Sequence, residues 1–512
     1  MNDAIDDVLV VGGGDAGLLA ALCIRELNPH LSIRIVDDFR AKRPDVGKST
    51  FQAIVDILHN FLRIDEAEFV EEVKPIWKAT VHFRDWCDRP PFHFPFDTHR
   101  LFRTPPNARL SEYLYYHYDV VHPDPDYLTI NGEMAEQSTT PFYFGNNGTL
   151  KRYPTFAYHL DTDRFNAYLR KICERRDIEL VDDRISKVDL SGDNIDSIHG
   201  EENAYAADLY IDSSGFDRVL TGNLDGEFID FDLPLDAAFN TRLDRPLREV
   251  EPTTVIETGE HGWFWQIDTF DYRDVGYVYG SDYVDRSEAK EAFLTKHELS
   301  TDVSLGHYDF TSGFYEDAWV GNCIPIGNAG GFIEPLQSTG LTANAKIASI
   351  LSILLAAHDR RNHPGIRNTF NAQVRVIWQT IYDFVCAHYR YVSPSNNFWA
   401  DVGDVTGTDH LDAIVEEYDQ NGINQGVTSV RHDDIVFKLA HYYYVMRKMG
   451  ATSKTYEQYP VAVGEDVRDR IDGFFEGVSD EVRNYLTPVE FYRGLSEEER
   501  REAITRIRRE AQ

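Results

Sequence analysis

The chain has 512 residues and a formal net charge of −35 at pH 7, from 51 Lys plus Arg against 86 Asp plus Glu. Hydrophobic residues make up 42% and aromatic residues 13%, which is ample for a large core and excludes a globally disordered chain. The acidic balance argues against nucleic acid or an anionic membrane as the main partner, because both require clustered Lys and Arg.

Only 13 of the basic residues are Lys. Scarce Lys with abundant carboxylates resembles proteins of salt-loving microbes, in which concentrated salt screens self-repulsion; an ordinary acidic cytosolic protein is the alternative. Five scattered Cys without a CxxC pair indicate a reducing compartment. The acidic N-terminus lacks the basic flank of a signal peptide, and the longest apolar run, 347–357, is shorter than the ~20 residues that span a bilayer. We therefore expect a cytoplasmic protein without a membrane segment.

The first elements are a strand, a glycine turn and a helix. An apolar run at 8–11 precedes Gly12-Gly13-Gly14-Asp15-Ala16-Gly17, a helical pattern follows at 18–27, and a second strand at 33–36 ends in Asp37. In this dinucleotide-binding pattern Gly12 allows the tight turn, Gly14 lets the backbone approach a pyrophosphate, and Gly17 permits close helix packing. Ala16 lies in the same turn, and Asp37 is the acid expected on the adenosine ribose hydroxyls.

The middle of the chain alternates strand signals, at 79–83, 185–190 and 275–279, with turns and an amphipathic helix at 161–174. A segment rich in Tyr, Pro and Asn at 101–144 predicts an irregular insertion. Beyond residue 342 the pattern is almost wholly helical, most clearly at 343–357, 363–391 and 433–449.

Two further strands run into glycine turns. One leads through Asp212 to Gly215, and the other into Gly327-Asn328-Ala329-Gly330-Gly331. A nicotinamide dehydrogenase needs one such turn, whereas a flavoprotein of the hydroxylase type uses additional ones to hold FAD. The order therefore predicts an α/β fold with a Rossmann-like FAD-binding domain at 1–345. A substrate-side insertion is expected at about 75–155, and a mainly helical substrate region at 346–512.

Four motifs make the chain resemble the flavin-dependent halogenases of the tryptophan halogenase family. Residues 262–267 match the family's WxWxIP signature, with Asp268 in place of the proline, and residues 327–340 resemble its second long motif. Gly47-Lys48-Ser49-Thr50 lies where the family has a strap over the flavin, and the Trp77-Lys78 block resembles the one that bears its essential lysine. The matches run from about residue 7 to residue 345.

The resemblance implies a reaction and roles for these residues. Reduced FAD from a separate flavin reductase, dioxygen and chloride or bromide would yield hypohalous acid, which Lys78 hydrogen-bonds or converts to a chloramine. The halogen would pass to an electron-rich indole, phenol or pyrrole. Trp263 and Trp265 would shield the flavin from the aromatic substrate, and the backbone of Ser338-Thr339-Gly340 would hold the halide. No metal is expected, and a homodimer is compatible with this interpretation.

Gln337 is the main departure, because the family has a glutamate at this place, paired functionally with the lysine. Glutamine cannot take a proton at neutral pH, and a missing general base typically costs ~10²–10⁴-fold. We therefore expect a natural substrate other than free tryptophan. An FAD monooxygenase or reductase of the same fold, and a flavin-binding protein that has lost catalysis, remain the alternatives.

Two aromatic stretches are candidates for lining a substrate pocket. They are the strip 92–102 and His441-Tyr442-Tyr443-Tyr444. A Tyr run on a helix is more often a packing feature than a ligand site, so no substrate contact is assigned to either.

Overall fold

The computed structural model describes residues 4–41, 47–97, 129–393, 396–422, 436–454, 473 and 477–511. The chain forms two compact units, each drawn from three stretches. Unit 1 comprises residues 1–65, 161–232 and 310–379; unit 2 comprises 66–160, 233–309 and 380–512. Most of the insertion expected at 101–144, and residues 98–102 of the aromatic strip 92–102, lie outside the described residues.

Unit 1 is built on a five-stranded parallel sheet. Its order is β10 (Glu179–Asp182), β2 (Ser32–Asp37), β1 (Asp7–Val11), β14 (Leu209–Asp212) and β22 (Cys323–Pro325). Parallel strands need crossover connections, so this sheet agrees with the α/β class predicted from the alternating strand and helix signals. All three glycine turns follow the carboxyl ends of β1, β14 and β22, which are neighbours in the sheet.

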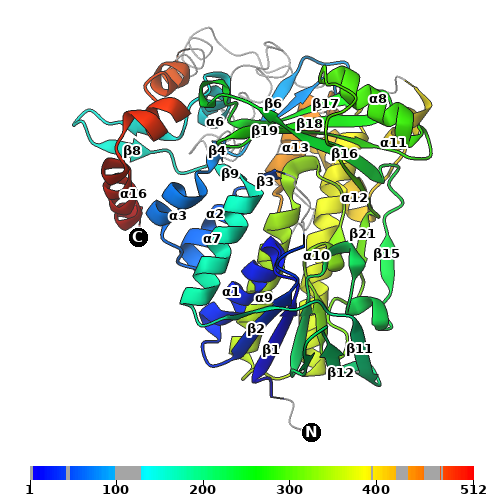
Figure 1. Cartoon of the computed structure of the whole chain (residues 1–512). Coiled ribbons are helices and arrows are strands. Elements are labelled where there is room, and N and C mark those ends of the chain that lie inside the picture. The colour runs from blue at the N-terminus through cyan, green and yellow to red at the C-terminus, as the bar shows by residue number, and fades with distance from the viewer. Residues whose placement is uncertain are drawn as a thin grey trace. The chain divides into compact units, whose positions relative to one another are not determined.

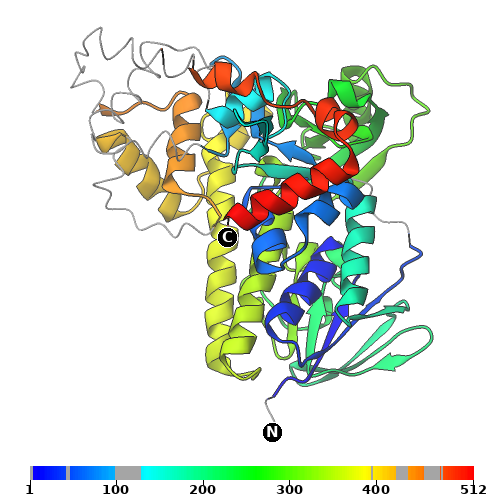
Figure 2. The same cartoon turned by 90° about the vertical axis from the view of Figure 1, so that its left-hand side faces the viewer.

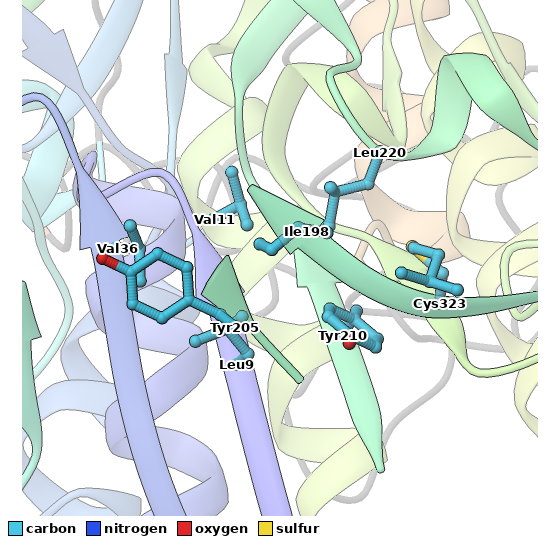
Figure 3. Packing of buried hydrophobic residues seen from close by; sticks show 9 residues of the cluster. Leu9, Val11, Val36, Ile198, Tyr205, Tyr210, Leu220 and Cys323 are labelled. Carbon is cyan, nitrogen blue, oxygen red and sulfur yellow. The ribbon is translucent and has the colours of Figure 1, made fainter. Parts of the chain in front are cut away.

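One face of this sheet packs against an antiparallel meander of β11 (Lys187–Ser191), β12 (Asn194–His199) and β13 (Ala204–Tyr205). Figure 3 shows the buried cluster between them, in which Leu9 and Val11 of β1 lie near Ile198 and Tyr205 of the meander. Helix α1 (Asp15–Leu27) packs against α7 (Thr162–Arg175) and α9 (Gly340–Ala357) (Figure 1). The remaining short elements of this unit are β3 (Lys48–Ser49), α2 (Ala53–Asp56), β15 (Phe228–Asp230), β21 (Gly313–Tyr315) and β23 (Gly331–Phe332).

Helix α9 and the turn before it, Leu336–Ala357, are long and apolar enough for a membrane span by length and composition, with a mean hydropathy of 1.5. Half of that window is buried inside the protein. The Ser352 hydroxyl donates to the Cys23 carbonyl, and Asn28 Nδ2 donates to the Ser352 carbonyl at 3.0 Å. Polar contacts of this kind with α1 are those of a core helix.

Unit 2 contains a seven-stranded sheet. Its order is β20 (Gly306–Asp309), β16 (Ala237–Asp244), β19 (Tyr272–Tyr279), β18 (Gly262–Asp268), β17 (Thr253–Gly259), β5 (Thr80–Arg84) and β6 (Phe92–Pro95). All pairs are antiparallel except β17 with β5. Because successive side chains alternate between faces, Phe264 points away from Trp263 and Trp265. Phe264 stacks on Tyr277 at 4.3 Å, in a cluster with Phe293 of α8 (Arg286–Lys296).

The C-terminal helix of unit 2 is tied to an early one. Arg500 of α16 (Glu497–Ala511) donates to both carboxylate oxygens of Glu71 in α3 (Glu66–Val73), at 2.6 and 2.7 Å. Figure 2 shows α16, in red, lying against this blue helix. The other elements of this unit are β4 (Ile76–Lys78), α6 (Ile130–Glu136), β7 (Phe142–Phe144), β8 (Leu150–Arg152), β9 (Ala157–Leu160), α11 (Asn397–Gly403), α12 (Asp409–Asn421) and α13 (Leu439–Lys448).

Every named element after Phe332 in the described part of the chain is a helix, as the helical pattern predicts. The boundary between the units falls inside the longest of them, α10 (Pro364–Tyr389). The two units interleave along the sequence.

Candidate functional site

The first glycine turn is too tight for side chains at two positions. A Cβ on Gly12, whose φ is +106°, would lie 2.2 Å from the Ser213 carbonyl oxygen. A Cβ on Gly17 would lie 2.0 Å from the Gly12 carbonyl oxygen. Helix α1 begins two residues after Gly13, and the first N–H groups of a helix have no partner within it. The turn therefore presents N–H donors at a helix N-terminus, which is an anion-binding arrangement.

Two residues brace this turn from other elements. Asp37, at the end of β2, accepts a hydrogen bond from Gly13 N at 2.9 Å through Oδ2. Asn166 of α7 donates to the Gly13 carbonyl at 3.3 Å and to Asp15 Oδ1 at 3.0 Å. Asp37 thus lies where a ribose acceptor is expected, whereas Asn166 carried no sequence signal beyond being a polar residue on the buried side of an amphipathic helix.

The second turn is organised by Asp212. Its wholly buried carboxylate accepts from Ser214 N and Oγ, at 3.1 and 2.6 Å, and from Leu220 N, Thr221 N and Thr221 Oγ1, at 2.7 to 3.0 Å. These bonds fix the shape of the turn. Gly215, with φ +72°, has no atom within 4 Å of where a Cβ would stand.

The third turn contacts the first. A Cβ on Gly327, whose φ is +78°, would lie 3.0 Å from Ala16 Cβ. Gly327 N donates to Asn344 Oδ1 at 2.8 Å, and Asn344 Nδ2 donates to the Gly340 carbonyl at 2.8 Å. Asn344 therefore couples this turn to the start of α9, a role that the motif pattern did not predict.

The strap is bound to the same helix. Gly47 and Thr50 are buried, and Phe51 N, just after the strap, donates to Thr342 Oγ1 at 3.3 Å. Unit 1 thus brings together the strap and all three glycine turns around the first turns of α1 and α9.

The loop before α9 is strained. Gln337 and Ser338 both have left-handed backbones, with φ +65° and +58°, and Thr339 returns to φ −83°. Such a conformation costs of order 1–3 kcal/mol in a residue with a side chain and clusters at functional sites. A reversal of φ between successive residues turns their N–H groups toward one point, the geometry of an anion nest. Nothing lies within 4 Å of where a Cβ on Gly340 would stand, so that side of the turn is open.

In unit 2, Lys78 ends β4 with no exposed surface. Its Nζ lies 5.2 Å from the centre of the Phe96 ring. Burial lowers the pKa of Lys78 well below its usual value. The sequence does not decide whether the Lys78 amine is exposed or buried, and the structure shows that it is buried.

A buried imidazole lies on the same face of this strand pair. The register Lys78↔Ala157 and Ile76↔His159 places Lys78 and His159 diagonally across it. His159 Nδ1 contacts the Asp268 carbonyl at 3.0 Å and Nε2 contacts Thr254 Oγ1 at 2.9 Å, so these partners assign the proton to Nδ1. Burial, reinforced by the Lys78 charge, lowers the pKa of His159 well below its usual value, and the ring beside Lys78 is neutral.

Trp77 points to the opposite face of β4. Its ring packs edge-on against Phe142 at 5.1 Å and Phe491 at 4.8 Å, and stacks on Tyr492 at 5.5 Å. Residues 491 and 492 belong to a single turn of π-helix, Glu490–Gly494, near the C-terminus. The lysine's strand is therefore held by a segment more than 400 residues away in the chain.

Trp263 and Trp265 lie side by side, as their spacing of two predicts, with ring centres 6.2 Å apart. Trp263 Nε1 donates to the Tyr389 hydroxyl at 3.2 Å, and Trp265 Nε1 to Asp274 Oδ1 at 2.9 Å. Both rings are almost wholly buried within unit 2.

Asp268, which replaces the motif's proline, organises a buried cluster of hydrogen bonds and ion pairs. Its buried carboxylate accepts from Arg273 Nε and Nη2 at 2.6 and 2.8 Å and from Glu251 N at 2.8 Å, with Arg245 Nε at 3.6 Å. These contacts anchor the end of β18, whose carbonyl holds His159.

The Tyr run on α13 serves packing. Tyr442 and Tyr444 are buried, and their hydroxyls donate to the carbonyls of Thr380 and His93, each at 2.9 Å. Phe92, Phe94 and Phe96 of the aromatic strip are buried too, and residues 98–102 lie outside the described residues.

The family model described as tryptophan halogenase matches residues 7–465. The chain belongs to the tryptophan halogenase family. Tryptophan 7-halogenase RebH of Lentzea aerocolonigenes is 26% identical over 95% of this chain and 97% of its own. Tryptophan 7-halogenase KtzQ of Kutzneria sp. (strain 744) is 28% identical over 81% of this chain and 82% of its own.

Solved structures of this family share the fold. MibH, a lathipeptide tryptophan 5-halogenase, has a TM-score of 0.82 and 25% identity, covering 96% of this chain and 93% of that one. The tryptophan 6-halogenase SttH of Streptomyces toxytricini has a TM-score of 0.83 at 24% identity, covering 96% of this chain and all of that one. These relatives are flavin-dependent halogenases, which confirms the fold class and the enzyme class expected from the motifs.

The residues of unit 1 fit the FAD that this halogenase family uses. Gly12 and Gly17 stand where any Cβ would collide with backbone, so the turn can receive a close-packed pyrophosphate. The Asp37 carboxylate is held at the end of the second strand, as ribose recognition requires.

Proposed function

We propose that this halogenase attaches chloride or bromide, as an electrophile, to an electron-rich aromatic substrate other than free tryptophan. The observation that carries the proposal is Lys78, a fully buried amine in the family's lysine block beside a neutral imidazole. When bound, reduced FAD from a separate flavin reductase would supply two electrons to dioxygen, and halide would supply the other two and become hypohalous acid.

For the cofactor, we assign residues of unit 1 that shape the glycine turns and residues of unit 1 that would contact FAD. Asp212 shapes its turn, and Asp37 receives the ribose. The residues that would line the flavin nucleotide are Gly12, Gly14, Ala16, Gly17, Gly47, Lys48, Ser49, Thr50, Gly215, Gly327, Asn328 and Gly331. We assign shielding of the flavin to Trp263 and Trp265, as the family resemblance implies.

For the halide, we assign the turn at residues 338–340. The N–H of Ser338 donates to the Pro335 carbonyl at 3.0 Å, so Ser338 contributes the left-handed bend. The N–H groups of Thr339 and Gly340, at the N-terminus of α9, are left to face an anion on the open side of the turn.

Lys78 serves as proton donor and acceptor in the halogen transfer. The O–X bond of hypohalous acid breaks, a C–X bond forms, and the departing hydroxide takes a proton from the Lys78 ammonium. The aromatic C–H bond then breaks, and its proton returns to the neutral amine, so that water is the second product. A lysine whose pKa lies well below its usual value can make both transfers near neutral pH.

Gln337 determines which aromatic rings suit this chemistry. Its side chain is 1% exposed and cannot accept the ring proton as a carboxylate would, so the Lys78 amine is the one acceptor that we assign. Phenols and pyrroles lose that proton more readily than an indole carbon, so we propose that such a ring is the substrate. The curated relatives RebH and KtzQ are named as tryptophan halogenases; this chain differs from their family's pattern at the residue that would take the proton.

The test supplies reduced FAD, oxygen and bromide with a panel of phenols, pyrroles and tryptophan, and measures products by mass spectrometry. Halogenated phenol or pyrrole is expected from the native enzyme and from Lys187→Ala, a control on an exposed lysine, but not from Lys78→Ala. Hydroxylated product without halogen would indicate a monooxygenase, and peroxide alone would indicate a flavin protein without catalysis.

A second variant tests the general-base argument. Gln337→Glu should raise the rate with tryptophan most, by up to ~10²-fold, because it restores a proton acceptor. An unchanged rate with every aromatic compound would refute the argument.

We also propose that the enzyme is adapted to salt. At low salt the net charge of −35 repels halide, whereas in molar salt the Debye length falls to ~3 Å and this barrier vanishes. The halogenation rate should rise with chloride or bromide well above the range that saturates an enzyme in dilute buffer. A rate that falls steadily above low salt would count against this.

A further inference from the structure

Carboxylates surround the turn that would receive the FAD pyrophosphate. Asp15 lies in the first turn of α1 and is 8% exposed, and Asp37 is bonded to the turn itself. Asp161 caps the N-terminus of α7, where Asp163 also lies. Burial, followed by the charges of Asp161 and Asp15, raises the pKa of Asp163.

A lysine of the strap stands against this cluster. Lys48 Nζ lies 3.9 Å from Asp15 Oδ2, with the lysine side chain 38% exposed and the aspartate side chain 7% exposed. The other oxygen of Asp15 accepts from Asn166 at 3.0 Å, so the carboxylate is fixed rather than free to turn away.

Two electrostatic effects oppose each other at the N-terminus of α1. The N-terminus of α1 attracts any negative charge, the Asp15 carboxylate as well as a pyrophosphate. When both are present they repel each other, and Lys48 is placed to offset that repulsion. Salt screens the Lys48 charge, whose side chain is 38% exposed, since the Debye length shrinks from ~10 Å at 0.1 M to ~3 Å at 1 M; the buried Asp15 charge is screened less.

We infer that the Asp15–Lys48 pair sets the FAD affinity with opposite signs: Asp15 opposes binding, and Lys48 favours it most strongly in dilute salt. The inference rests on the proposed cofactor site and adds a named determinant to it. It predicts opposite effects for the two partners. Removing the Asp15 charge strengthens FAD binding in dilute salt, and removing the Lys48 charge weakens it.

The experiment titrates the full-length apoprotein with oxidised FAD and follows flavin fluorescence from 0.05 to 2 M potassium acetate, a salt without halide. Asp15→Asn keeps an oxygen for the Asn166 bond and should bind FAD roughly tenfold more tightly than the native protein at 0.05 M. Lys48→Gln should bind roughly tenfold more weakly there, and this difference should fall below about twofold at 2 M, whereas the Asp15→Asn difference should shrink less.

Asp193→Asn is the matched control, because it removes one negative charge from an exposed turn of the same unit. Circular dichroism at each salt concentration restricts the comparison to conditions in which every variant is folded. The inference is overturned if Asp15→Asn behaves like the native protein, or if Asp193→Asn shifts FAD affinity equally. A Lys48→Gln difference that does not shrink with salt overturns it while leaving the proposed function standing. Absence of FAD binding at every salt concentration would overturn both.

Discussion

Gly276 is required by the tryptophan opposite it. It faces Trp265 across β18 and β19, and a Cβ at Gly276 would lie 1.9 Å from Trp265 Cζ2 and 2.1 Å from Cη2. In Gly276→Ala the indole must therefore move by about 1.5 Å, an overpacking that typically costs ~1–3 kcal/mol. That movement also breaks the 2.9 Å bond from Trp265 to the buried carboxylate of Asp274, worth ~1.5–3 kcal/mol.

The expected loss is thus about 3–5 kcal/mol in the free energy of unfolding, measured by urea denaturation. Gly403→Ala, in helix α11 of the same unit, is the control, because its Cβ would have ordinary contacts at 3.8 Å or more. It should change stability by less than about 1 kcal/mol, in either direction.

A double-mutant cycle tests the cause. Trp265→Phe removes the outer ring atoms that the new Cβ would strike, so Gly276→Ala should cost about 1–3 kcal/mol less in that background. Additive losses would show that the alanine acts elsewhere, for example on the strand backbone, and would refute the reasoning.

Three further changes follow from the site. Lys78→Met should abolish halogenation and raise the free energy of unfolding at pH 7. Burial lowers the folded-state pKa of Lys78, so the unfolded chain binds more protons between that pKa and ~10.4. The gain in free energy of unfolding should therefore shrink as pH rises toward ~10.4. A gain that stays constant from pH 7 to 10 would contradict this. In urea denaturation, Asp268→Asn should cost about 3 kcal/mol, because it leaves Arg273 without its buried partner. Asp419→Asn, at an exposed ion pair, is the control and should cost less than ~1 kcal/mol. Equal losses would show that the buried cluster is unimportant. Ser338→Gly should stabilise the fold by about 1 kcal/mol in the same assay by relieving a φ of +58°, and a loss of stability would place the strain elsewhere.

The first glycine turn and Asp37 were predictable from sequence because the backbone sterics that select glycine act over a few residues. Gly12 is required by its φ of +106° and Gly17 by a clash with the Gly12 carbonyl, both within one strand, turn and helix, and Asp37 lies one crossover further along the chain. The helix at 161–174 followed in the same way from its periodicity and is observed at Thr162–Arg175. No long-range information was needed for either.

The residues that brace these motifs were not predictable. Asn166, Asn344 and Thr342 reach the glycine turns and the strap from helices far along the chain, and each looked like an ordinary polar residue in a helical pattern. Asp268 could be seen as a departure from its motif, but its arginine partner and its bond to His159 exist only once β18 has paired with its neighbours.

The fold class and the family therefore followed from the sequence by itself, which also singled out the glycine turns and Lys78 as candidates. Only the tertiary structure decided that Lys78 is a wholly buried amine beside a neutral imidazole, and that two interleaved units share the chain. The reason is physical. Backbone sterics and side-chain periodicity act over a few residues, whereas burial and hydrogen-bond partnership depend on which distant segments come to cover a group.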